Sequence, residues 1–149
     1  MHPHLFYHKE ENLMIQAYSK NVTVATNTGV PFNSTSLIKG CTSTKTGVST
    51  ITLNKAGVYM LEFDAAVAGT VGGTISVQLS KNGTLMPEAF TAETAADTTD
   101  LHSISFQTLV QVNHDNSCRC SDSGTVVEII NTGVPALYTH ANIVITKIC

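Results

Sequence analysis

The sequence predicts an all-β protein built as a two-sheet sandwich or jelly roll, and three observations support this fold class. About nine or ten short apolar runs recur at roughly 8–14-residue spacing, with Gly, Asn and Pro turn signals between them. Several of these runs alternate apolar and polar residues, as half-buried strands do. Charged residues make up only 13% of the chain, against about 25% in a typical domain, while threonine, which favours strands, is abundant.

The clearest alternation lies in two neighbouring segments, 57–67 and 73–79. Because side chains on a strand point alternately to opposite sides, one face of each segment should be buried. The connection 68–72 is short enough for a hairpin, so we expect the two strands to pair. The predicted core face comprises Tyr59, Leu61, Phe63, Ala65, Val67, Ile75, Val77 and Leu79.

The other elements follow from turn chemistry and alternation. Asn82-Gly83 predicts a type I′ hairpin turn, because Asn and Gly both tolerate positive φ. The pentapeptide Asn-Thr-Gly-Val-Pro occurs identically at 27–31 and 131–135, and both copies are expected to be turns. Further strands are expected at 14–18 and 22–25 as a first pair, then at 36–41, 50–54, 85–92, 100–113, 125–130 and 136–148, with 88–98 an irregular or edge segment.

Residues 1–13 differ in composition from the remainder, so we divide the chain into an N-terminal arm (1–13) and a β domain (14–149). The arm holds three of the six histidines and three adjacent charges. Its apolar residues Leu5, Phe6 and Tyr7 are the candidates for docking on a particle or a partner. The arm lacks the apolar core of a secretory signal, so we expect synthesis in the cytoplasm without such a signal.

The long strands carry a second face that is not of the charged, solvated kind, which predicts that this face packs on another copy of the chain. Glu62 and Asp64 share this face and should be paired across the interface or lie at its wet rim, because unpaired buried carboxylates are costly. The expected interface residues are Val58, Met60, Ala66, Ser105, Gln107, Leu109 and Tyr138.

No catalytic, cofactor or metal site is expected from the sequence. Net charge is −3 without a basic run, and no apolar stretch approaches 18 residues, so neither nucleic acid nor a membrane is expected as a partner. His114 and Asp115 lie near Cys118 and Cys120 as in a nucleophilic site, but a solvated loop is favoured. Cys41 and Cys149 are expected either as a disulfide or, by slight preference, as two buried thiols.

Three segments together resemble the C1q/TNF-like jelly roll. Residues 53–63 are similar to the family's Gly-x-Tyr strand, 77–83 to its Lys-Asn-Gly hairpin, and 103–112 to a long strand near its trimer axis. The resemblance implies a ten-stranded, two-sheet jelly roll that forms a compact homotrimer. It is nearest to trimeric domains of bacteriophage virion proteins and spore-surface filaments, although a collagen-like Gly-x-y tract is absent.

The resemblance gives two expectations about function. In the first, the protein is a non-enzymatic structural component of a bacteriophage virion, attached by its arm to a major capsid, fibre or tail protein and displayed on the particle surface. In the second, it is a trimeric module that binds a receptor or carbohydrate, such as a host-surface glycan. In a trimer, three copies of Cys118 and Cys120 near the axis would form a thiol cluster for disulfides or a soft metal.

Overall fold

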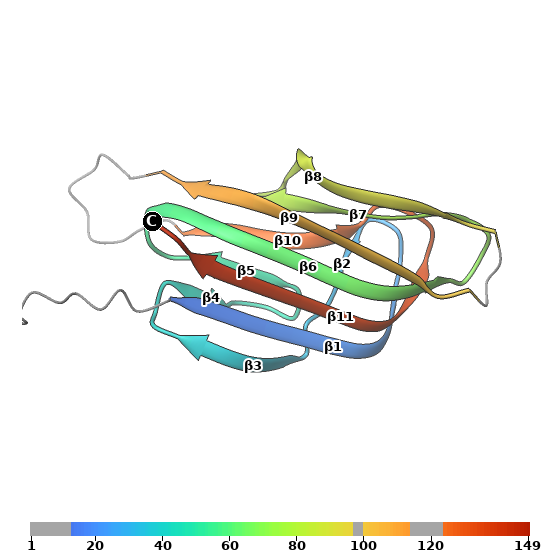
Figure 1. Ribbon diagram of the computed structural model, residues 1–149, viewed down its shortest axis with the longest axis horizontal. Coiled ribbons are helices and arrows are strands. Elements are labelled where there is room, and N and C mark those ends of the chain that lie inside the picture. The colour runs from blue at the N-terminus through green and yellow to red at the C-terminus, as the bar shows by residue number, and fades with distance from the viewer. Residues whose placement is uncertain (1–12, 97–99, 114–123) are drawn as a thin grey trace, which may run out of the picture.

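A computed structural model describes residues 13–96, 100–113 and 124–149, and these form strands without a helix (Figure 1). The arm residues Leu5, Phe6 and Tyr7 and the thiols Cys118 and Cys120 lie outside the described residues. The strands are β1 (Met14–Val24), β2 (Thr28–Gly29), β3 (Ser34–Lys39), β4 (Ser43–Lys45), β5 (Thr50–Leu53), β6 (Gly57–Gly69), β7 (Gly73–Lys81), β8 (Thr84–Ala95), β9 (His102–Val112), β10 (Thr125–Asn131) and β11 (Ala136–Lys147).

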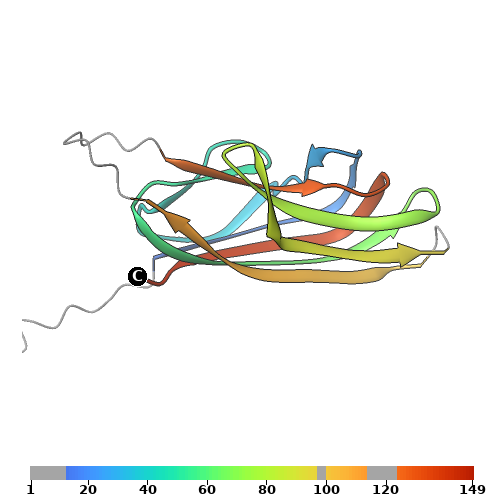
Figure 2. The same cartoon turned by 90° about the horizontal axis from the view of Figure 1, so that it is seen from above.

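The strands form two antiparallel sheets that pack face to face, as Figures 1 and 2 show. The five-stranded sheet has the order β3-β1-β11-β6-β9. The six-stranded sheet has the order β4-β5-β10-β7-β8, with the two-residue β2 also pairing with β10. This arrangement confirms the predicted all-β, two-sheet jelly roll.

The hydrophobic core lies between the two sheets and contains the predicted core face. Tyr59, Leu61, Phe63 and Val67 of β6 are almost fully buried, and so are Ile75, Val77 and Leu79 of β7. The ring of Phe63 lies edge-on to Phe32 with centroids 6.2 Å apart, and 5.7 Å from the ring of Phe106. Burying these aromatic and aliphatic side chains is the main favourable contribution to folding.

The predicted hairpin between 57–67 and 73–79 is wrong, because β6 and β7 belong to different sheets. Both edges of β6 are occupied by β11 and β9, and both edges of β7 by β10 and β8. The short link between them crosses from one sheet to the other. It is held by Thr70, whose backbone N and Oγ1 both donate to the Pro135 carbonyl, at 3.0 and 2.8 Å. The two alternating core faces therefore oppose each other across the sandwich.

The predicted first pair, 14–18 and 22–25, is one continuous strand. β1 pairs with β11 from Met14 to Val24, and the expected break is only a local irregularity at Asn21, which has φ of 53°. Asparagine tolerates this left-handed conformation at low cost, so the strand continues through it.

The placement of Tyr138 on the outer face is also wrong. The pairing of β11 with β6 shifts register between Tyr138 and His140, so Thr139 is an extra residue that reverses the alternation. Tyr138 therefore points inward with Ala141 and Ile143, and its side chain is fully buried. Burial raises the pKa of its phenol, and its hydroxyl has no hydrogen-bond partner.

The predictions for the turn at 82–83 and for the segment 88–98 both have clear outcomes. Asn82 and Gly83, with φ of 51° and 85°, join β7 to β8 as the predicted hairpin turn. Residues 88–95 belong to the edge strand β8. Of the two possibilities expected for 88–98, an irregular segment or an edge segment, the structure therefore shows the edge segment. Pro87 lies within this strand at an irregularity where residues 86–89 have no register partner on β7, so its missing N–H removes no ladder bond.

The two copies of Asn-Thr-Gly-Val-Pro lie side by side but have different structures. Asn27 is a turn residue with φ of 61°, as expected, and its N–H donates to the Asn131 carbonyl at 2.7 Å. Asn131, expected in a turn, instead ends β10 and is fully buried. Its side-chain amide donates to the carbonyls of Val24, Ala25 and Val134 at 3.0, 3.3 and 3.1 Å.

Candidate interaction surfaces

The outer face of the five-stranded sheet, which points away from the core, carries six of the seven residues expected at an interface. Val58, Met60 and Ala66 lie half-buried on β6. Ser105, Gln107 and Leu109 are exposed on β9, and the side chain of Leu109 is 56% exposed. The register places Met60 beside Leu109, so apolar side chains from the two strands are adjacent.

A row of polar side chains crosses the same outer face. Gln16 Nε2 on β1 donates to Asn142 Oδ1 on β11 at 3.1 Å, and Asn142 Nδ2 donates to Asp64 Oδ1 on β6 at 3.2 Å. Gln107 Nε2 on β9 donates to Met60 Sδ at 3.0 Å. Each of these amides donates a hydrogen bond within the subunit, which lowers the cost of removing it from water. Gln16 and Asn142 were not among the residues expected at an interface, although each occupies an outward position on an alternating strand.

Two carboxylates lie in the middle of this face. Glu62 and Asp64 are exposed on β6, and Glu62 stands between Val144 of β11 and Gln107 of β9 in the sheet register. The one acidic side chain within 4 Å of a basic or imidazole nitrogen among the described residues is elsewhere: His102 Nδ1 on β9 lies 3.4 Å from Glu93 Oε1 on β8. Any partner that covers the outer face must therefore leave Glu62 and Asp64 hydrated or pair them.

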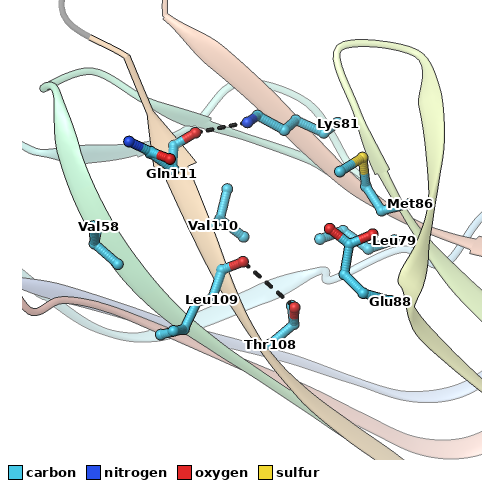
Figure 3. Close-up of a pocket in the computed structure, with 9 residues that line it drawn as sticks. All are labelled: Val58, Leu79, Lys81, Met86, Glu88, Thr108, Leu109, Val110 and Gln111. Atoms are coloured by element: carbon cyan, nitrogen blue, oxygen red, sulfur yellow. Dashed lines mark hydrogen bonds between the residues drawn. The ribbon is translucent and has the colours of Figure 1, made fainter.

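A pocket of about 400 Å³ opens between β8 and β9, beside the outer face (Figure 3). Its apolar wall includes Leu79 and Val110, which are almost fully buried. Lys81 Nζ donates to the Gln111 carbonyl at 2.6 Å and so caps the otherwise unpaired edge of β9. The other lining residues are Val58, Met86, Glu88, Thr108 and Leu109. The sequence did not point to this pocket, because its residues come from four strands that pair over long distances.

The described chain begins at one end of the sandwich. Lys147 N donates to the Leu13 carbonyl at 2.8 Å, and Val58 N donates to the Cys149 carbonyl at 3.2 Å, so the start of β1 and the end of β11 lie together with the start of β6. Figure 1 shows this end at the left, where β3 and β9 also finish. We call it the arm end.

The preferred prediction of buried thiols is wrong for Cys41 and Cys149. Both are exposed, and neither forms a disulfide. Cys41 lies in the turn after β3 and Cys149 follows β11, so neither belongs to the inward-facing residues of a strand. In the described residues, no three His, Cys, Asp or Glu side chains are grouped so that they could hold a metal ion. The same residues include no helix long and apolar enough to cross a membrane.

Comparison with known proteins finds similarity by structure alone. No protein-family model matches the sequence, and no curated protein is similar to it. The PRD1 vertex protein P5 superposes with a TM-score of 0.59 and 20% identity, over 93% of this chain and 99% of that one. Eiger TNF from S. frugiperda gives 0.67 and 14%, over 94% of each chain. Murine APRIL gives 0.65 and 11%, over 93% and 100%.

This chain has the TNF-like jelly-roll fold. Nearly the whole of each solved chain is matched. The expectation drawn from segments 53–63, 77–83 and 103–112 is confirmed at the level of fold. The identities are too low to carry an activity or a partner from these proteins to this one.

Proposed function

We propose that this protein is a non-enzymatic structural component of a bacteriophage virion, displayed as a homotrimeric jelly roll on the capsid or on a fibre or tail appendage. The observation that carries the proposal is the likeness to the PRD1 vertex protein P5, which extends over 93% of this chain. That protein is named as a vertex protein. The same fold also occurs in TNF-type proteins, so the fold alone does not select this function.

The outer face of the five-stranded sheet supports the trimer. It combines the apolar side chains of Val58, Met60 and Leu109 with amides that already bond one another. Apolar surface of this kind is stabilised by burial, at about 25 cal/mol per Å². Closed symmetric association of identical chains is the commonest way to cover such a face in a soluble oligomer.

The arm supports the mode of attachment. The domain starts at the arm end, so residues 1–12 precede a single end of the sandwich. In the proposed arrangement Leu5, Phe6 and Tyr7 engage a major capsid, fibre or tail protein, and the opposite end of the sandwich faces outward. The three-residue apolar group is the part of the arm that can gain most from burial.

Particle binding tests this function. Purified protein is incubated with particles from which the native copy has been stripped, and retention is measured by sedimentation. The intact chain should sediment with the particles, and a variant with Leu5, Phe6 and Tyr7 all changed to Ala should remain in solution. A matched variant with His2, His4 and His8 changed to Ala should still sediment. Equal retention of the apolar variant and the intact chain would reject attachment through the arm.

A further inference from the structure

In the described part of the chain, the residues other than glycine that adopt positive φ are all asparagines. They are Asn21, Asn27 and Asn82, with φ of 53°, 61° and 51°. Asn82 differs from the other two because glycine follows it, and the pair Asn-Gly occurs nowhere else in the sequence. Asn82 and Gly83 form the exposed turn between β7 and β8 in the six-stranded sheet, away from the face proposed for association.

The turn leaves the backbone nitrogen of Gly83 free to react. The nitrogen that follows an asparagine can attack the side-chain amide carbon, and glycine has no side chain to hinder the approach, whereas a β-branched residue crowds it. A Cβ built on Gly83 would meet no atom within 4 Å, so the turn is open on that side. Among the turn hydrogen bonds of the described residues, none has the Gly83 nitrogen as its donor.

Strand β10 holds the side chain of Asn82 by its carbonyl oxygen. Asn82 N donates to the Val126 carbonyl at 2.8 Å, and Val126 N donates to Asn82 Oδ1 at 2.8 Å. Negative charge develops on Oδ1 when a nucleophile adds to Cγ, and the Val126 N–H is already placed to stabilise that charge, as the donors of an oxyanion hole are. Asn27 shares the first of these bonds, through its N–H to the Asn131 carbonyl at 2.7 Å, but not the second among the described residues.

We propose that this turn modifies itself by deamidation at Asn82. A base in the solvent takes the proton of Gly83 N, the nitrogen forms a bond to Asn82 Cγ, and the bond from Cγ to Nδ2 breaks. Nδ2 takes a proton from water and departs as ammonia, which leaves a cyclic succinimide. Water then opens the ring at Cγ to give aspartate, or at the backbone carbonyl to give isoaspartate.

The two products differ in their effect on the hairpin. The aspartate product keeps the original backbone, and its carboxylate still accepts the Val126 N–H in a charge-assisted bond. Isoaspartate adds a methylene to the backbone inside a two-residue turn that Lys81 and Thr84 close. Because loop length sets the register of a hairpin, isoaspartate should weaken the pairing of β7 with β8. The inference is independent of the proposed function, since it needs only the turn and β10.

Peptide mapping of the folded chain tests the proposal. The natural chain is incubated in mildly alkaline buffer and digested, and mass spectrometry scores each asparagine for conversion to aspartate or isoaspartate. Asn82 should convert at least about tenfold faster than Asn27, because the β-branched Thr28 crowds the approach to the Asn27 amide. Absence of conversion at Asn82 in the folded chain, while the same peptide converts in a chain unfolded in urea, would overturn the proposal, because the turn would then protect the amide.

The variant Thr28→Gly isolates the contribution of the Val126 N–H. It creates a second Asn-Gly pair, at an exposed turn where the asparagine also has positive φ but lacks the bond to Oδ1. Conversion at Asn27 should rise and should stay about three- to tenfold below conversion at Asn82, as one hydrogen bond predicts. Equal conversion at the two sites would overturn the role assigned to Val126.

Urea unfolding of the separated products tests the effect on the hairpin. Asn82→Asp, which reproduces one product, should unfold at nearly the same urea concentration as the natural chain. The isoaspartate fraction should unfold at a lower concentration. Equal midpoints for the natural chain and the isoaspartate fraction would overturn the expected damage to the hairpin.

Discussion

The outer faces of the two sheets differ in the hydrogen bonding of their side chains. On the six-stranded sheet, polar side chains form short hydrogen bonds with one another. Ser49 Oγ donates to Glu128 Oε2 at 2.5 Å, and the hydroxyls of Ser76 and Thr132 lie 2.7 Å apart. Its exposed apolar residues are Leu85 and Phe90 on the edge strand β8 and Val126 on β10.

On the outer face of the five-stranded sheet, Met60 of β6 adjoins Leu109 of the edge strand β9. Gln16 donates to Asn142 and Asn142 donates to Asp64 across this face, and the carboxylates of Glu62 and Asp64 are exposed. In the proposed trimer, the outer face of the five-stranded sheet is covered by neighbouring copies, and the outer face of the six-stranded sheet remains in solvent. Substitutions on the outer face of the six-stranded sheet should change the stability of a subunit, and substitutions on that of the five-stranded sheet should change association.

The largest expected effect is on association. Met60→Lys places an ammonium group beside Leu109 on the outer face of the five-stranded sheet, and removing that charge from water in an interface costs several kcal/mol per subunit. The variant should be monomeric by light scattering at concentrations where the natural chain is oligomeric. The matched change Thr74→Lys, on the exposed outer face of β7, should leave the mass unchanged. Dissociation by Thr74→Lys alone would reverse the assignment of the faces.

The second effect concerns the stability of a subunit. Asn131→Ala removes the buried amide that donates to the carbonyls of Val24, Ala25 and Val134, and should lower the free energy of unfolding by about 3 kcal/mol. Asn27→Gly, in the other copy of the pentapeptide, should change it by less than about 0.5 kcal/mol, because glycine accepts the positive φ. Urea titration at fixed protein concentration measures both. Equal losses would mean that the two copies have equivalent roles.

The smallest expected effect tests whether Tyr138 lies in the core or on the outer face. Its buried hydroxyl has no partner, so Tyr138→Phe should raise the free energy of unfolding by about 1 kcal/mol. Tyr59 is the matched case, because its hydroxyl donates to the Lys55 carbonyl at 2.7 Å, and Tyr59→Phe should lower the free energy of unfolding by about 1 kcal/mol. Neither change should alter the oligomer mass. A change in the oligomer mass of Tyr138→Phe would instead indicate that Tyr138 lies at the interface.

Alternation along single strands made much of the fold predictable. It assigned Tyr59, Leu61 and Phe63 to the core, and it assigned the two faces of 100–113 correctly, because inward and outward residues differ in polarity there. The turn at Asn82-Gly83 could also be predicted, because positive φ restricts the residue types.

Pairing between strands could not be predicted in the same way. Alternation shows that β6 and β7 each have a buried face, but it is the same whether the two strands pair or oppose each other across a core. Tyr138 was misplaced because one extra residue at Thr139 reverses the alternation without a signal in composition. The pocket was missed because Lys81, Glu88 and Gln111 meet only after long-range pairing.

The oligomeric state tests the central claim most directly, and light scattering on a size-exclusion column measures it without a partner or a label. The account predicts a single species of about three times the 15.9 kDa chain mass, which persists on dilution into the micromolar range. The apolar outer face of the five-stranded sheet would then be covered by neighbouring copies. A monodisperse monomer at the same concentrations would contradict both the interface and the trimer that the proposed virion role requires.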